Sequence, residues 1–136
     1  MLTLDTSGIL AALNNRDPHH AQAVATLRAD GGPFIVPVGI MADVTYMIEA
    51  RLGAVVLDEF LADLEEEAFA LDCQEGDLSR VRVLVTRYRD FPLGCSDAAV
   101  IACAERNGGR VLTFDLRHFP IVAREGTIQL VGLDEE

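Results

Sequence analysis

Two aspartates follow short apolar runs at opposite ends of the sequence. Asp5 ends the stretch LTLD, and Asp115 follows the stretch RVLTF. Two further aspartates, Asp43 and Asp97, lie in segments with helical spacing. Carboxylate oxygens are hard ligands that suit Mg²⁺ or Mn²⁺, and a cation held by them can activate water for attack on a phosphodiester. The four residues therefore predict a metal-dependent hydrolytic site, provided that the fold brings them together.

Three of these aspartates also have a purely structural explanation. Asp5 and Asp115 could each be the N-cap of a helix, a position that aspartate suits well. Asp97 follows Ser96 at an expected helix start, where the helix dipole favours a negative charge by ~0.3–1 kcal/mol. For each of the three taken alone, capping explains the residue about as well as catalysis does.

Asp43 is harder to explain as a cap. Helical spacing predicts a mid-helix position on or beside an apolar stripe formed by Ile40, Met41, Val44, Met47 and Ile48. A carboxylate there needs a partner, so the structural alternative is an internal salt bridge to an arginine. If all four carboxylates gather, two unit charges ~4 Å apart repel by ~4 kcal/mol at an effective dielectric constant near 20. Such a cluster requires raised pKa values or bound cations.

Short apolar runs alternate with longer segments of helical spacing along the chain. We predict strands at residues 2–5, 33–36, 68–73, 110–114 and 127–133, and helices at 6–15, 18–30, 38–51, 55–67, 77–89 and 96–107. Thr6 or Ser7 is the expected cap of the first helix, and Ser96 that of the last. The alternation predicts a three-layer α/β/α sandwich on a mainly parallel sheet of about five strands. Sites in such sheets form beyond the carboxyl ends of the strands, so Asp5 and Asp115 converge if the first and fourth strands are neighbours.

Size and composition fit one domain that spans residues 1–136. The net charge is −11 and the sequence contains no lysine, so we expect no general basic surface that could hold nucleic acid. No apolar run approaches the ~20 residues of a membrane-spanning helix, and no Lys or Arg precedes the first apolar stretch, so we expect a cytoplasmic protein. The three cysteines, Cys73, Cys95 and Cys103, are predicted to be free, buried thiols.

Other residues allow more than one interpretation. The predicted helix 77–89 carries four arginines, which could contact RNA phosphates, although a solvated helix face is the preferred interpretation; they are Arg80, Arg82, Arg87 and Arg89. His118 follows the predicted acidic site, and we assign it to packing or loop shape. The apolar helical segment 39–64 exceeds what one small core needs, which predicts a homodimer surface or a groove for a partner helix.

Three segments of the sequence resemble a known family. LDTSGILAAL, PVGIMADVTYMI and SDAAVIACAERNGGRVLTFD with the trailing LRHF resemble, in this order and spacing, the PIN-domain ribonucleases, and most closely the VapC-like toxins of bacterial toxin–antitoxin pairs. The resemblance covers nearly the whole chain and is most specific from Asp97 to Phe119. It implies an endoribonuclease that cuts single-stranded RNA with Mg²⁺ or Mn²⁺, and a small antitoxin partner that covers the active site.

The resemblance also implies the residues of the site. Carried onto this sequence, the metal-binding and catalytic carboxylates are Asp5, Asp43, Asp97 and Asp115, and Thr113 matches a polar helper near the metal or water. One departure concerns Asp43, because the family usually has Glu at that position and Asp is one methylene shorter. Glu49 is nearby in the sequence, but its spacing predicts the opposite side of the helix, so we do not favour it as a replacement.

Two other functions compete with this interpretation. A haloacid-dehalogenase-type phosphatase or a response-regulator receiver also has an aspartate at a strand end, but both depend on a lysine, which this sequence lacks. The phosphatase also requires a second aspartate two residues after Asp5, where Ser7 stands. The other alternative is a PIN-like domain that binds RNA or a partner without cleavage, which the departure at Asp43 keeps open.

Overall fold

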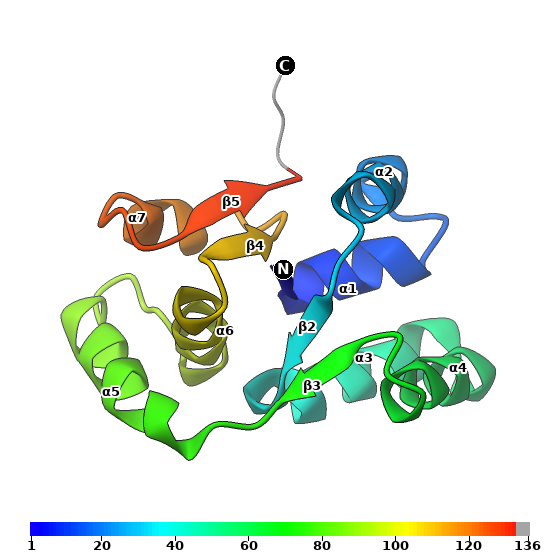
Figure 1. The fold of residues 1–136 in the computed structure, drawn as a ribbon, viewed down its shortest axis with the longest axis horizontal. Helices are drawn as coiled ribbons and strands as arrows, with labels where there is room; N and C mark the ends of the chain where they lie inside the picture. The colour runs from blue at the N-terminus through cyan, green and yellow to red at the C-terminus, as the bar shows by residue number, and fades with distance from the viewer. Residues whose placement is uncertain (133–136) are drawn as a thin grey trace.

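The computed structural model describes residues 1–132 and shows one central sheet between two layers of helices (Figure 1). Its five strands are all parallel and lie in the order β3-β2-β1-β4-β5. They are β1 (Leu2–Leu4), β2 (Phe34–Pro37), β3 (Ala70–Asp72), β4 (Arg110–Leu112) and β5 (Gln129–Val131). The prediction of an α/β/α sandwich on a parallel sheet is therefore confirmed.

The helices divide between the two faces of the sheet. In Figure 1, α1 to α4 lie on one side and α5 to α7 on the other. The helices are α1 (Thr6–Leu13), α2 (His20–Asp30), α3 (Met41–Leu52), α4 (Ala54–Glu65), α5 (Leu78–Arg87), α6 (Cys95–Arg106) and α7 (Phe119–Ala123). Two short 3₁₀ turns, η1 (Val38–Ile40) and η2 (Glu75–Asp77), precede α3 and α5. Helix α7 was not predicted, and the predicted helix 38–51 joins η1 and α3. The last predicted strand reaches Leu133, which lies outside the described residues.

The core is built around β1, β4 and α6. Leu2 and Leu4 of β1 and Val111 and Leu112 of β4 are almost completely buried, as expected for parallel strands covered on both faces. Helix α6 is rich in small residues and lies against β1, β2 and β4 as well as α5. Because its side chains are short, α6 can pack closely on the sheet and hold its N-terminal turn near the carboxyl ends of the strands.

The pairing of β1 with β4 brings together two segments that lie far apart in the sequence. Thr3 is opposite Val111 and Leu4 is opposite Leu112, so both strands end at the same edge of the sheet. Gly8 allows α1 to start directly on this edge, because a Cβ atom there would lie 2.6 Å from the carbonyl oxygen of Leu112. The condition under which Asp5 and Asp115 converge, that the first and fourth strands are neighbours, is therefore met.

Several surface features differ from the predictions. Cys103 is buried, but Cys73 and Cys95 are exposed, so only one thiol matches the expected buried position; all three are free. Arg80 and Arg87 do not simply face solvent, because Arg80 binds Glu105 and Glu125 at 2.9 Å and Arg87 binds Glu125 at 2.7 Å. These ion pairs join α5 to α6 and to the end of α7.

Membrane insertion is not supported by the helices of residues 1–132. None of them combines the length and the apolar composition that crossing a bilayer requires.

Candidate functional site

Asp5 is both a helix cap and the most buried carboxylate of the site. Its Oδ1 accepts hydrogen bonds from the backbone N–H of Gly8 at 2.7 Å and from the Ser7 hydroxyl at 2.8 Å. The N-cap of α1 is therefore Asp5, and the predicted cap at Thr6 or Ser7 is wrong. Burial raises the pKa of Asp5 to about 6, although these hydrogen bonds act in the opposite direction. The second carboxylate oxygen is directed toward β4.

Thr113 connects the carboxylates at the ends of β1 and β4. Its hydroxyl donates to Oδ2 of Asp5 at 2.6 Å and accepts from the backbone N–H of Asp115 at 3.0 Å. The Ser7 hydroxyl accepts from the backbone N–H of Phe114 at 2.9 Å, which fixes the same loop to α1. Thr113 is completely buried. It therefore positions Asp5 and Asp115 relative to each other, at the place where the sequence predicts a polar helper.

Asp115 organises the turn that precedes α7. Its Oδ1 accepts from the backbone N–H groups of Arg117 at 2.8 Å and His118 at 3.1 Å, and its Oδ2 lies 3.0 Å from Nδ1 of His118. Burial raises the pKa of Asp115, but the hydrogen bonds from His118 and Arg117 outweigh this effect, so the net pKa is lower than usual. Asp115 thus closes the turn before α7 and lies in the acidic site, but it is not the N-cap of α7, which is His118, so the capping alternative is wrong for this residue.

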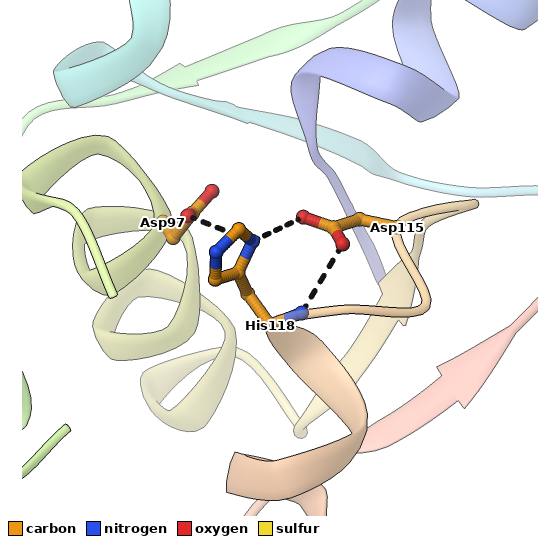
Figure 2. A group of neighbouring side chains, drawn as sticks. All are labelled: Asp97, Asp115 and His118. Atoms are coloured by element: carbon orange, nitrogen blue, oxygen red, sulfur yellow. Dashed lines mark hydrogen bonds and ion pairs between the residues drawn. The ribbon is translucent and has the colours of Figure 1, made fainter. Parts of the chain in front are cut away.

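His118 lies between two of the predicted carboxylates (Figure 2). Its Nδ1 is 3.0 Å from Oδ2 of Asp115 and 3.8 Å from Oδ2 of Asp97. The ligand atoms of these three residues lie within 4.8 Å of one another, close enough to hold one metal ion. The sequence analysis gave His118 a packing or loop role only. Its spacing of three residues from Asp115, within a turn, was the signal that could have placed it in the site.

Asp97 completes the acidic cluster from the opposite helix. It lies in the first turn of α6 and is partly buried. Burial raises the pKa of Asp97, His118 lowers it, and the charges of Asp115 and Asp43 raise it further. Asp5, Asp97 and Asp115 together line a pocket of about 270 Å³. Three of the four predicted carboxylates therefore meet at one cavity.

Asp43 occupies a different position from the one expected. Helix α3 starts only at Met41, after the η1 turn, so Asp43 lies in the first helical turn rather than in mid-helix. It is exposed, and its Oδ2 accepts from the Ser96 hydroxyl at 2.6 Å. Within residues 1–132 it forms no salt bridge to an arginine, so the buried ion pair considered above is wrong.

The contact between Asp43 and Ser96 depends on the close approach of η1 to α6. A Cβ atom on Gly39 would lie 2.6 Å from the Cβ of Ala99, so glycine is needed there. Ser96 is not the N-cap of α6, because the helix begins at Cys95 after Gly94. Its hydroxyl instead donates to Asp43 and brings that carboxylate near the start of α6. Asp43 does not line the pocket itself, but its negative charge helps to raise the pKa of Asp97.

The sheet is parallel, and carboxylates gather beyond β1 and β4 and at the start of α6. This combination of fold and site is that of an α/β hydrolytic domain with an acidic site. Residues 2–125 match the PIN domain, and the chain therefore belongs to the PIN domain family. Within this family it is VapC-like: it is 29% identical over 120 residues to Ribonuclease VapC26 of Mycobacterium tuberculosis (strain ATCC 25618 / H37Rv). The aligned region covers 87% of this chain and 89% of the relative. The family resemblance is thus confirmed.

Solved structures of similar proteins have the same fold. VapC20 of Mycobacterium tuberculosis, described as a sarcin-ricin loop cleaving toxin, superposes with a TM-score of 0.76 at 18% identity, over 90% of this chain and 95% of its own. VapBC2 from Rickettsia felis, solved bound to a promoter DNA fragment, superposes with a TM-score of 0.68 at 14% identity. The superposition covers 95% of this chain and 96% of that chain. FitAcB from Neisseria gonorrhoeae superposes with a TM-score of 0.62 at 16% identity, and the superposition covers 96% of each chain.

Proposed function

We propose that this protein is a metal-dependent endoribonuclease that cleaves single-stranded RNA and acts as the toxin of a toxin–antitoxin pair. The observation that carries this proposal is the meeting of Asp5, Asp97 and Asp115 at one pocket. Its relatives support the choice of substrate, since VapC26 is named a ribonuclease and VapC20 is described as cleaving the sarcin-ricin loop. The family membership supports phosphodiester hydrolysis over the phosphatase and receiver alternatives.

The residues of the pocket fit a divalent cation. Carboxylate oxygens of Asp97 and Asp115 and a ring nitrogen of His118 lie within reach of one ion, and Asp5 lines the same pocket. Hard oxygen donors suit Mg²⁺ and Mn²⁺, and an imidazole nitrogen favours Mn²⁺ of the two. The raised pKa values of Asp5 and Asp97 reflect burial and neighbouring negative charge, both of which a cation would offset. When bound, the cation would activate a water molecule and stabilise charge on the phosphate.

The protein's own groups position these carboxylates. Thr113 holds Asp5 and Asp115 through its single hydroxyl, and His118 orients Asp115 through Nδ1. Asp43 receives the hydrogen bond of Ser96, so we place it outside the direct ligand set, where it can act on the site through water or through the start of α6.

A cleavage assay with and without a chelator tests this function. The purified protein is expected to cut a single-stranded RNA when Mn²⁺ or Mg²⁺ is added, and to lose this activity in EDTA. Undiminished cleavage in EDTA would contradict the metal-dependent mechanism. RNA binding without cleavage in either metal would support the alternative of a non-cleaving PIN-like domain, which the departure at Asp43 keeps open.

We further propose two protein partners, a small antitoxin and a second copy of this chain. The structural likeness to VapBC2 and FitAcB supports an antitoxin, and apolar side chains on α3 and α4 support a protein interface. Tyr46 is 73% exposed and Val55 is 72% exposed, both within the segment 39–64 that the sequence marks as too apolar.

Light scattering on the purified protein is expected to give twice the mass of the chain. Co-expression with the small protein of an adjacent gene is expected to give a stable complex without nuclease activity. A protein that stays monomeric at all concentrations would contradict the homodimer. A complex that remains fully active would contradict the antitoxin.

A further inference from the structure

Arg51 is a cationic side chain at the edge of an acidic pocket. It lies in the last turn of α3 and lines the same cavity as Asp5, Asp97 and Asp115. Arg80, Arg87, Arg106 and Arg110 are all bound to carboxylates. Arg51, in contrast, forms no ion pair with any residue in the described part of the chain. Its guanidinium therefore remains available for an external anion.

A second cavity continues from Arg51 away from the carboxylates. It has a volume of about 610 Å³ and is lined by Arg51 together with Asn14, Asn15 and Arg16 from the turn after α1. Leu13, Leu52 and Val56 form its apolar part. Arg16 is exposed and, like Arg51, has no ion-pair partner among residues 1–132. Arg51 lines both cavities, so the two cavities adjoin at its side chain, and we call the surface past Arg16 and Arg51 the arginine path.

Helix stability alone does not explain this pair of arginines. A cation in the last turn of α3 is favoured by the helix dipole, which accounts for Arg51. Arg16 lies beyond the end of α1 in an irregular turn, where its backbone N–H binds the Asn14 side chain at 3.0 Å. No helix end or carboxylate partner within the described chain accounts for its charge there.

The chemistry of this path matches a phosphodiester backbone. Guanidinium groups present paired N–H donors that fit phosphate oxygens, and asparagine amides add neutral donors. A chain with a net charge of −11 repels a polyanion over most of its surface, so unpaired arginines beside the site have a large effect on where a strand can lie. We propose that Arg16 and Arg51 form a phosphate-binding subsite for the RNA strand next to the cleavage pocket. This inference rests on the proposed nuclease function.

The arginines of α5 offer a competing location. Arg82 and Arg87 line a cavity of about 470 Å³, but no acidic residue of the site lines it. Arg87 is already bound to Glu125. Figure 1 also shows α5 at the opposite end of the molecule from α3 and α4. The path past Arg16 and Arg51 is therefore favoured, because Arg51 also lines the pocket of the carboxylates.

The salt dependence of RNA binding tests the subsite without requiring cleavage. A fluorescent single-stranded RNA is titrated in EDTA with the wild type, Arg16→Gln/Arg51→Gln, and the matched control Arg82→Gln/Arg89→Gln. Each phosphate contact adds ~0.7 to the slope of log K against log salt for single strands, so the first double variant is expected to lose ~1.4. The control removes the same charge and is expected to keep the wild-type slope. Arg16→Lys/Arg51→Lys is expected to recover most of the slope but only part of the affinity.

Cleavage kinetics with Mn²⁺ separate this subsite from the chemistry. Arg16→Gln/Arg51→Gln is expected to raise KM about tenfold or more with little change in kcat, because the arginines contact phosphates beside the reacting one. Equal slopes for the two Gln double variants would overturn the subsite while leaving wild-type cleavage, and so the proposed function, intact. If Arg16→Gln/Arg51→Gln binds RNA like the wild type but no longer binds an acidic protein partner, the phosphate-binding subsite is also overturned. The two arginines would then belong to the surface that binds that partner. If the wild type binds RNA but cuts none, the function fails, and the slope still decides the subsite.

Discussion

Asp97→Asn is expected to reduce RNA cleavage on the order of a hundredfold or more. Asp97 faces Asp115 and His118 at the proposed metal position, and even outer partners of metal ligands cost roughly 10–100-fold when they are removed. The metal-free protein is expected to keep its stability, because the substitution removes a carboxylate whose pKa burial and neighbouring charge raise. Cleavage rates at saturating Mn²⁺ measure the first effect, and urea unfolding in EDTA measures the second.

Metal binding gives an independent readout for the same variant. At about one hundred times its dissociation constant, a cation that binds only the folded protein adds ~2.7 kcal/mol to the free energy of unfolding. Mn²⁺ is therefore expected to raise the melting temperature of the wild type, and much less that of Asp97→Asn. An equal rise in both proteins would remove Asp97 from the metal site.

Asp43→Asn is the matched control for Asp97→Asn. Both changes remove one carboxylate charge, but Asp43 is exposed and lies outside the pocket. The Asn side chain can still accept the hydrogen bond from Ser96, so we expect a smaller loss of cleavage and little change in stability. A loss as large as that of Asp97→Asn would show that Asp43 reaches the metal directly.

Asp5→Asn is expected to make the metal-free protein more stable near neutral pH. The pKa of Asp5 rises from 3.8 to about 6 on folding, mainly through burial. The folded state therefore binds more protons than the unfolded state between these values, and stability is lost as the pH rises through about 6. Above this pH the ionised carboxylate lowers the free energy of unfolding by about 3 kcal/mol, and asparagine avoids this loss because it carries no charge. The lost hydrogen bond from Thr113 offsets part of the gain.

Chemical denaturation in EDTA at about pH 4 and about pH 7 measures this effect. The advantage of Asp5→Asn over the wild type is expected near pH 7 and is expected to disappear near pH 4, where the native carboxyl is protonated. A variant that is less stable than the wild type at pH 7 would show that the hydrogen bonds of Asp5 outweigh the cost of its burial. Cleavage by the variant is expected to be lost in either case.

Features that depend on local pattern and on general rules of parallel sheets could be predicted from the sequence. The alternation of apolar runs with helical segments predicted the layers and the parallel sheet. Asp5 and Asp115 converge because both strand ends point the same way and β1 pairs with β4. The family resemblance drew attention to Thr113 as a polar helper, and the structure places its hydroxyl between Asp5 and the backbone N–H of Asp115.

Features that depend on where helices begin, or on contacts between distant segments, could not be predicted. Asp43 was expected beside a buried stripe, but the η1 turn shifts the start of α3 and leaves it exposed. Ser96 looked like a cap, yet its hydroxyl binds a residue 53 positions away. His118 lies 3.8 Å from Asp97 in the first turn of α6, and no sequence period signals that contact between distant segments.

The pairing of β1 with β4 also determines when the site can exist during synthesis. Thr113 and Asp5 are 108 residues apart, so the first strand leaves the ribosome long before its neighbour is made. Closing so long a loop is entropically unfavourable and slows folding, because the contacts that repay it are all non-local. A nascent chain that ends before β4 therefore lacks Asp115 and cannot assemble the carboxylate cluster. The order of translation thus delays any hydrolytic activity until β4 and the turn that carries Asp115 have emerged.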